Sequence, residues 1–490
     1  KKVPQSNYMS KSLSYQAVKG VMWSAVERFS VQGIQFVLSI VIARLVLPSE
    51  YGLIAMLGIF LAIAQTFVDS GFSNALIQKK DRTEVDYSTV FYFNILIALV
   101  VYGVLFISAP YIASFYREPE LTTVTRWAGL NVVLNGFSIV QRAKLTIRVD
   151  FKTQAKASLI AVIVSGLIGI LLAYRGYGIW ALVFQTLSSS LLNTLLLWMF
   201  ARWLPLLCFS WESFKSLFSF GSKLLLSGLL HTIYINLYSL VIGRRYSAMD
   251  VGFYNRASQF SGFPSTNIVG IITRAIYPLQ CEMQDDDDRL SASFIQYLRM
   301  SCYIIFPLMT VLGVLSESLV RFLLTEKWLP SAELLSILCF AYMWYPVMVI
   351  NNQILNVKGR SDYFLKAEII KKVVAIGILI LTLPFGVRVL CWGIVLYNFF
   401  DMGIIIYYSR KVISTGYREQ ARNIMPLFLL SLGMGISIYL SQVFLDGSSL
   451  LLRLALGCIV AFVSYMIFGF IFRVREFQQL LYIKKIRKDV

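Results

Sequence analysis

Three long hydrophobic segments of the chain each carry polar and charged side chains on a single helical face. Within each segment the polar positions follow one another at intervals that return to the same side of a helix. An ionisable group at the centre of a membrane-spanning helix costs at least ~2.5–3.5 kcal/mol, so it normally faces a cavity or a partner. The candidate binding residues are Arg28, Gln32 and Gln35 in segment 18–46, Lys223 and His231 in segment 214–243, and Arg256, Asn267 and Arg274 in segment 250–280.

The chemistry of these residues is anion binding. Arginine donates two parallel hydrogen bonds from a planar guanidinium, a geometry that matches phosphate. Glutamine and tyrosine side chains beside it suit hydroxyl-rich groups. The three faces therefore predict a mostly cationic cavity for an anionic headgroup that carries sugars, with an attached lipid tail left in the bilayer.

The four cations and the histidine among these residues also have a purely structural interpretation. Arg28 could pair with Glu27 or Asp69 in a buried ion pair that only fixes packing. Long cationic side chains near helix ends can also extend to the membrane surface. The other structural alternatives are Lys223 and Arg274 at the cytoplasmic surface, Arg256 at the outer surface, and His231 as a satisfied polar group.

The few acidic residues inside hydrophobic segments are candidates for an ion- or proton-coupling site or for ion pairs. These residues are Glu27, Asp69 and Asp401, with Glu368 as a further candidate. Lys371 and Lys372 are adjacent, so at most one of them can face a cavity squarely. We expect the other to lie near the lipid interface.

Metal and cofactor sites are not expected. The six cysteines are scattered and form no CxxC pair, and a single histidine excludes any site that needs two imidazoles. The four consecutive aspartates at 285–288 are adjacent on one loop, and adjacent carboxylates do not form a cation cage. We therefore predict a solvated hydrophilic turn there.

The candidate binding and coupling residues lie in hydrophobic stretches, which fill the chain almost end to end. Hydrophobic residues make up 57% of the sequence and charged residues 14%, far from the balance of soluble proteins. A spanning helix needs ~20 apolar residues, so about fourteen spans account for the whole length. The predicted spans are 18–46, 50–76, 86–115, 121–141, 154–174, 178–203, 214–243, 250–280, 294–323, 331–356, 364–384, 388–409, 423–444 and 448–472.

The loops between these spans alternate in charge, which predicts the orientation of the chain in the membrane. Most of the 45 Lys and Arg lie in every second loop and in both terminal segments. Cations that flank short loops stay in the cytoplasm, so both termini are predicted to be cytoplasmic. The net charge of +19 is then a topology signal and a contact with anionic lipid headgroups, and no nucleic-acid partner is expected. The first predicted span, 18–46, is too long for a cleavable signal peptide and should remain in the protein as helix 1.

An internal repeat divides the chain. Val41-Ile42-Ala43-Arg44 followed by Glu50-Tyr51-Gly52 returns 200 residues later as Val241-Ile242-Gly243-Arg244 followed by Asp250-Val251-Gly252. Helices 1–6 and 7–12 are then equivalent halves that enter from the same side, a frame typical of alternating access. We predict an N-terminal six-helix lobe at 1–207, a C-terminal six-helix lobe at 208–412, and helices 13 and 14 with a basic tail at 413–490.

Several of these motifs resemble a known family. Trp23-Ser24, Ala43-Arg44-Leu45, Glu50-Tyr51-Gly52, Asp69-Ser70-Gly71-Phe72 and Glu326-Lys327-Trp328, together with the stretch from Tyr254 through Pro264 to Pro278, are similar to the polysaccharide-transporter branch of the multidrug/oligosaccharidyl-lipid/polysaccharide flippase superfamily. The similarity covers nearly the whole chain and is greatest to flippases of the colanic-acid and lipopolysaccharide type.

This resemblance implies an all-α membrane protein with a V-shaped pair of six-helix bundles. It implies alternating-access transfer of an undecaprenyl-pyrophosphate-linked oligosaccharide across the bacterial inner membrane, with no chemistry on the cargo and no cofactor. Arginines in related lipid flippases bind the pyrophosphate, and Arg28 and Arg256 resemble them in helix location. A polysaccharide polymerase and other export proteins are the implied partners.

Two other classes of protein remain as alternatives. A multidrug exporter of the same superfamily would favour cationic drugs and a carboxylate in helix 1, whereas helix 1 here offers Arg28 beside Glu27. A polysaccharide polymerase or ligase usually needs a large outer loop, and every predicted outer loop is short. The chain is therefore predicted not to be an enzyme.

Overall fold

The computed structural model describes residues 30–69, 72–79, 81–445, 447–472 and 475, and this part of the chain contains helices and no strands. The all-α prediction is confirmed. The chain divides into two compact units, Lys1–Gly252 and Phe253–Val490, each considered below by itself. The sequence-based division at 207 and 412 stays a prediction.

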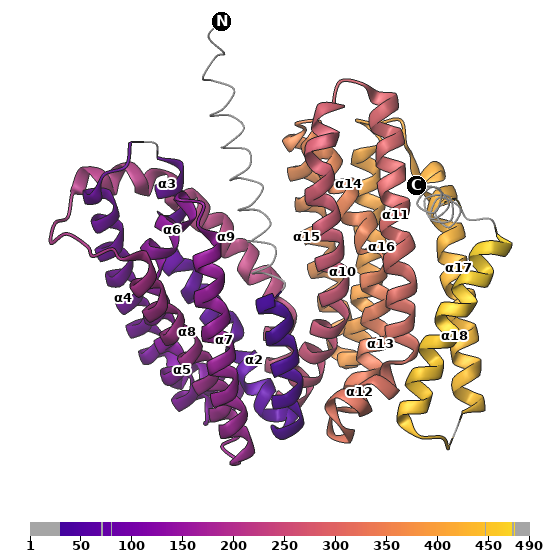
Figure 1. Ribbon diagram of the computed structural model, residues 1–490, viewed down its shortest axis with the longest axis horizontal. Coiled ribbons are helices and arrows are strands. Elements are labelled where there is room, and N and C mark those ends of the chain that lie inside the picture. The colour runs from indigo at the N-terminus through magenta and orange to yellow at the C-terminus, as the bar shows by residue number, and fades with distance from the viewer. Residues whose placement is uncertain (1–29, 70–71, 80, 446, 473–474, 476–490) are drawn as a thin grey trace, which may run out of the picture. The chain divides into compact units, whose positions relative to one another are not determined.

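The first unit is a bundle of long helices whose neighbours pack side by side (Figure 1). α8 lies between α5 and α7, and α2 packs against α4, α5 and α9. Its helices are Ser30–Leu45, α2 (Pro48–Asp69), α3 (Phe72–Gln78), α4 (Glu84–Tyr116), α5 (Leu121–Gly136), α6 (Ile139–Ile147), α7 (Phe151–Tyr174), α8 (Ile179–Ala201) and α9 (Trp211–Arg245), followed by the first residues of α10 (Ala248–Glu282).

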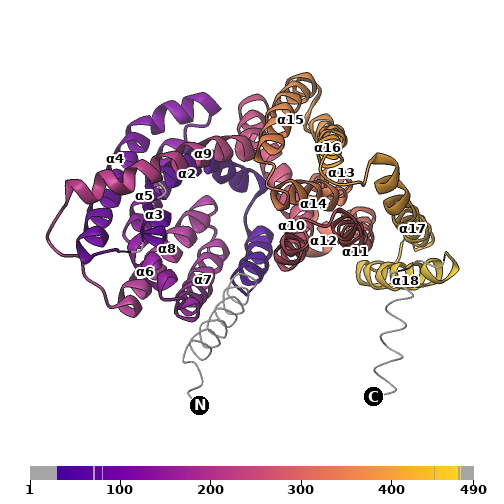
Figure 2. The same ribbon diagram turned by 90° about the horizontal axis from the view of Figure 1, so that it is seen from above.

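The second unit is built around α11, and α17 and α18 lie together at one of its edges (Figure 2). One face of α11 is fully buried in the core of this unit. Its residues follow one another at intervals of four or seven, which return to the same side of a helix: Leu290, Phe294, Leu298, Cys302 and Met309. The helices of this unit are the rest of α10, α11 (Asp287–Val314), α12 (Ser316–Leu324), α13 (Pro330–Met343), α14 (Tyr345–Val357), α15 (Ser361–Thr382), α16 (Val387–Ser409), α17 (Tyr417–Phe444) and α18 (Leu450–Ile471).

The described part of the chain holds nine helical segments long and apolar enough to cross a membrane. The chain is therefore a multi-pass membrane protein, whereas the count of fourteen spans stays a prediction. α10 and α15 are also long, but their polar and charged side chains keep them out of this class. Five of the eight candidate binding residues lie on α9 and α10.

The aspartate run before α11 has a more specific role than the predicted solvated turn. Asp286 is the N-cap, and its side chain accepts a hydrogen bond of 3.0 Å from the amide of Arg289. Asp287 and Asp288 occupy the first helical turn, where carboxylates interact favourably with the positive end of the helix dipole. α11 consequently begins at 287, seven residues before the predicted span.

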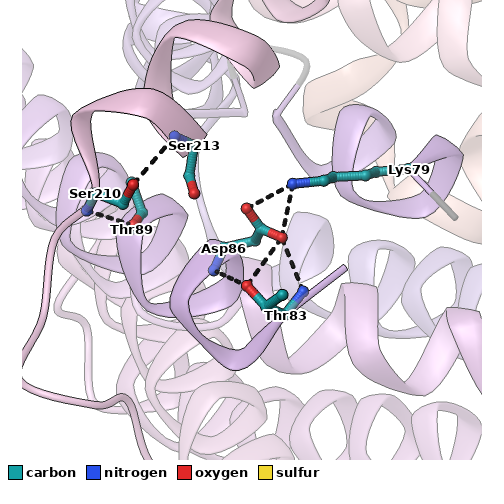
Figure 3. A network of polar contacts seen from close by, with 6 residues as sticks. All are labelled: Lys79, Thr83, Asp86, Thr89, Ser210 and Ser213. Carbon is teal, nitrogen blue, oxygen red and sulfur yellow. Dashed lines mark hydrogen bonds and ion pairs between the residues drawn. The ribbon is translucent and has the colours of Figure 1, made fainter. Parts of the chain in front are cut away.

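The segment that joins α8 to α9 is held against the start of α4. The Ser88 and Thr89 hydroxyls accept hydrogen bonds of 2.9 and 3.0 Å from the amides of Leu206 and Ser210. Beside them, buried Asp86 accepts two hydrogen bonds of 2.7 and 2.8 Å from Lys79, as Figure 3 shows. These contacts satisfy backbone amides that have no helical partner, so the connection keeps a fixed path over α4.

Lys144 also fixes the connection between α8 and α9, through contacts with two aromatic rings and a carboxylate. The Lys144 ammonium lies 4.2 Å from the ring centre of Tyr87 and 4.8 Å from that of Trp203, and it donates to Glu84 at 2.8 Å. The indole of Trp203 donates to the same carboxylate at 2.6 Å. Burial lowers the pKa of Lys144, and its bond to Glu84 opposes that shift.

The repeated motif has the same structural role in both copies. The Glu50 carboxylate accepts a hydrogen bond of 2.8 Å from the amide of Leu47 at the start of α2. The Asp250 carboxylate accepts one of 3.1 Å from the amide of Ser247 at the start of α10. Each acidic residue thus satisfies an amide at a helix N-terminus, which explains its spacing from the helix start.

The glycine of each copy permits a close backbone approach. A Cβ atom on Gly52 would lie 1.6 Å from the carbonyl oxygen of Ala248, and one on Gly252 would lie 2.2 Å from that of Pro48. These positions are related by the repeat offset of 200 residues. The first turns of α2 and α10 therefore cross backbone to backbone, which only glycine allows.

Replacing Gly52 with alanine is expected to destabilise the protein by ~1–3 kcal/mol or more, because a backbone carbonyl must move. The measurement is the melting temperature of the purified full-length protein. Gly58→Ala in the same helix is the matched control, since its new Cβ would approach nothing closer than Asn236 at 4.0 Å. Equal melting temperatures for the two variants would contradict the close approach.

Candidate functional site

The first polar face lies on the helix Ser30–Leu45. Gln35 is exposed, and Gln32 is partly buried with an Oε1 atom that accepts no hydrogen bond from the described residues. A buried amide oxygen without a donor is costly in an apolar setting. Glu27 and Arg28 lie outside the described residues, so their predicted roles stay predictions.

The second polar face lies on α9. His231 is exposed, and the side chain of Lys223 is not among those the structure describes. Beside His231, the Thr232 hydroxyl lies 3.1 Å from that of Thr66 and links α9 to α2. This bond holds the His231 turn against a neighbouring helix while the imidazole stays accessible.

The third polar face, on α10, includes one buried arginine. The Arg256 side chain is 5% exposed and donates a hydrogen bond of 2.8 Å to Gln259 Oε1. Its guanidinium carbon also lies 5.7 Å from the ring centre of Trp328 in the same unit. Contacts with both an amide and an indole give Arg256 a packing role inside the second unit. Its predicted part in cargo binding stays a prediction.

Arg274 and Asn267 differ from Arg256 in their surroundings. Arg274 is exposed. Asn267 is partly buried and donates a hydrogen bond of 2.8 Å to the carbonyl of Phe263, which leaves its side-chain oxygen able to accept. Arg274 is therefore the predicted α10 cation whose head is accessible to a ligand.

Asp69 ends α2 and is exposed. It accepts a hydrogen bond of 3.1 Å from Gln65, whose own oxygen accepts one of 3.1 Å from Asn135 on α5. The carboxylate therefore terminates a short polar chain between two helices. Its predicted pairing with Arg28 is not tested, because Arg28 lies outside the described residues.

A buried charge cluster joins α15 to α16. The Lys371 side chain is 2% exposed, and its ammonium lies 2.7 Å from Glu368 and 3.1 Å from Asp401. Lys372 reaches the same Glu368 at 3.6 Å, and the Tyr397 hydroxyl donates to Asp401 at 3.4 Å. Two positive and two negative charges thus balance in this cluster, which makes the burial of Lys371 and Asp401 tolerable.

The sequence predicted part of this cluster. Asp401 was expected in a coupling site or an ion pair, and the structure pairs it with Lys371. The position of Lys371 at the centre was missed, although the helical spacing of Glu368 with both lysines was a usable signal. Among the described residues, no group of three or more potential ligands could hold a metal ion.

Comparisons with known proteins agree with this architecture. The family described as polysaccharide biosynthesis protein matches residues 41–333. The chain is 27% identical over 356 residues to the teichuronic acid biosynthesis protein TuaB of Bacillus subtilis (strain 168), covering 72% of this chain and 73% of TuaB. It is 26% identical over 445 residues to the lipopolysaccharide biosynthesis protein WzxC of Escherichia coli (strain K12), covering 89% of each.

Among solved structures, the lipid II flippase MurJ in an inward closed conformation has the same fold. The TM-score is 0.73 at 14% identity, and the match covers 94% of this chain and 100% of MurJ. At this level of identity the match shows the fold alone. The predicted fold class is thereby confirmed over nearly the whole chain, while the count of fourteen helices stays a prediction.

Proposed function

The chain belongs to the polysaccharide biosynthesis protein family, and from this membership we propose that it is a flippase for a lipid-linked oligosaccharide. The cargo is an undecaprenyl-pyrophosphate-linked repeat unit of a lipopolysaccharide or exopolysaccharide, moved between membrane leaflets by alternating access. The observation that carries the proposal is a lipid-flippase fold over 94% of a chain whose relatives are polysaccharide biosynthesis proteins. The protein is a transporter and not an enzyme.

Cargo binding is assigned to the accessible residues of the three polar faces. Arg274 is the clearest phosphate ligand, because it is exposed and can donate two parallel hydrogen bonds. Gln35, His231 and Asn267 offer hydrogen bonds for sugar hydroxyls. Arg28, Gln32, Lys223 and Arg256 complete the proposed set.

Coupling to an ion or proton gradient is assigned first to Asp69. Its carboxylate is exposed and is hydrogen-bonded to the neutral amide of Gln65. Asp401 shares a buried ammonium with Glu368, so an incoming cation would have to compete with Lys371 there. Glu27 stays a candidate from the sequence.

The proposed location is the bacterial inner membrane with both termini in the cytoplasm, next to a polysaccharide polymerase. A cysteine in place of Asp285, in a background without the six native cysteines, is expected to react with a membrane-impermeant maleimide only after permeabilisation. A cysteine at Ser448, at the predicted outer end of the span 448–472, is the matched control and should react in intact cells. The reverse pattern would overturn this orientation.

Depletion of the protein in its own host tests the flippase function. The expected result is lipid-linked repeat units that accumulate in the inner membrane and resist periodate applied to intact spheroplasts, because their sugars face the cytoplasm. Loss of a polymerase would instead leave single repeat units open to the reagent. Unchanged repeat-unit levels together with greater sensitivity to cationic drugs would favour a multidrug exporter.

A further inference from the structure

An apolar groove lies between α5, α7 and α8 in the first unit. Its volume is about 540 Å³, within the range of ~300–1,000 Å³ typical of ligand pockets. The lining is almost entirely aliphatic and aromatic, and the Ser188 hydroxyl already donates to the Phe184 carbonyl at 2.6 Å. The lining residues are Leu130, Val133 and Leu134 of α5, Ile168 and Leu172 of α7, and Phe184, Leu187, Ser188 and Leu191 of α8.

The groove can therefore hold hydrocarbon but offers no free hydroxyl donor to a polar ligand. α7 and α8 are both long and apolar enough to span the membrane, so the groove lies at bilayer depth. Leu191 is 44% exposed, which shows that the groove opens to its surroundings at this residue. In a membrane those surroundings are lipid chains.

Two arginines lie near one end of the groove. Arg126 precedes Leu130 by four residues on α5, and Arg175 follows Leu172 by three at the end of α7, so each lies one turn beyond the lining on the same face. Arg175 is exposed, and the Arg126 Nε atom makes no hydrogen bond with the described residues. The Arg126 guanidinium lies 4.3 Å from the ring centre of Phe106.

Tryptophans mark the same end as the membrane interface. Trp180 precedes Phe184 by one turn of α8, and their ring centres are 6.1 Å apart. Trp127 of α5 packs against both rings, at 6.4 Å and 5.8 Å. Tryptophan is enriched where hydrocarbon meets headgroups, so this end lies at headgroup level.

We propose that the groove binds one acyl chain of an anionic phospholipid, with the lipid phosphate held by Arg126 and Arg175. The groove contacts the acyl chain, and the two guanidiniums contact the phosphate. The tryptophans place the junction between acyl chain and phosphate at headgroup level. The stretch from Phe184 to Leu191 is about 10 Å long at ~1.5 Å per residue, enough for part of one acyl chain. The bilayer also presents phospholipid at a far higher concentration than any transported lipid.

This site requires only that the chain spans a membrane, and it is independent of the flippase proposal. The test uses the full-length protein purified in detergent and melted with phosphatidylglycerol or phosphatidylcholine of identical chains. A specific ligand of the folded state raises the melting temperature, so phosphatidylglycerol is expected to stabilise the wild type by a few degrees more than phosphatidylcholine. Native mass spectrometry should show phosphatidylglycerol retained on the protein.

Two kinds of variant separate the groove from the cations. Leu191→Trp fills the groove from its exposed edge, and Arg126→Gln with Arg175→Gln removes the charges. Each change is expected to abolish the difference between the two lipids and the retention of phosphatidylglycerol. Leu195→Phe, on α8 outside the lining, and Arg117→Gln, at the end of α4, are matched controls that should keep both.

Three results would overturn the proposal. Phosphatidylcholine could stabilise the wild type as much as phosphatidylglycerol, or the lipid difference could survive in Leu191→Trp or in the double arginine variant. A polyprenyl phosphate could also stabilise the wild type through the groove while phosphatidylglycerol does not, which would assign the groove to the tail of the cargo. Transport assays play no part in these outcomes, so a failure here leaves the flippase proposal unaffected.

Discussion

Replacing Arg274 with alanine is expected to reduce export of the lipid-linked oligosaccharide by about tenfold to a hundredfold without loss of folded protein. A hydrogen bond to a charged group contributes ~1.5–3 kcal/mol, and ~1.4 kcal/mol corresponds to a factor of ten. The side chain is exposed, so its removal leaves no cavity in the second unit. The measurement is surface polysaccharide in cells whose membranes contain wild-type amounts of the variant.

Two further variants show whether the guanidinium itself is required. Arg274→Lys keeps the charge but loses the planar pair of donors, so it should export at an intermediate level. Arg289→Ala removes an exposed cation at the start of α11, whose carboxylate neighbour Asp286 is 4.0 Å away, and should export normally. Normal export by Arg274→Ala at wild-type protein level would remove Arg274 from the cargo site.

The contrast with Arg256 shows what sequence periodicity could predict and what it could not. The spacing of Arg256, Asn267 and Arg274 places all three on one face of α10, and this face was predicted correctly as helical. Periodicity does not tell which neighbour covers each turn of the face. Trp328 and Gln259 cover Arg256, whereas Arg274 stays exposed.

The repeat motif shows a similar limit. The matching acidic residue and glycine predicted that two helices begin in the same way, and the hydrogen bonds from Leu47 and Ser247 explain why. The reciprocal crossing of Gly52 and Gly252 could not be predicted, because it depends on how the two helix starts meet in space. Local chemistry was therefore readable from the sequence, and contacts across 200 residues were not.

Replacing Lys371 with methionine is expected to destabilise the protein by ~3–5 kcal/mol, the cost of breaking a buried ion pair from one side. The ammonium is the closest cation to both Glu368 and Asp401, and its removal takes from Asp401 its ion-pair partner and leaves Glu368 with only Lys372 at 3.6 Å. Once the shared ammonium is gone, the two negative charges repel each other strongly in a medium of low dielectric constant. The measurement is the melting temperature of the full-length protein, together with its amount in the membrane.

Compensating changes separate the loss of charge balance from the loss of packing. The variant with Glu368→Gln, Lys371→Met and Asp401→Asn carries no buried charge at these three positions, and it should recover most of the stability, because neutral residues of similar volume often replace a buried ion pair without loss. Lys372→Met is the matched control on the same helix. Its side chain is 38% exposed and lies 3.6 Å from Glu368, so a small effect is expected. If Lys371→Met melts at the wild-type temperature, or if the triple variant is no more stable than Lys371→Met, charge balance is not what Lys371 provides, and Asp401 again becomes available as a coupling residue.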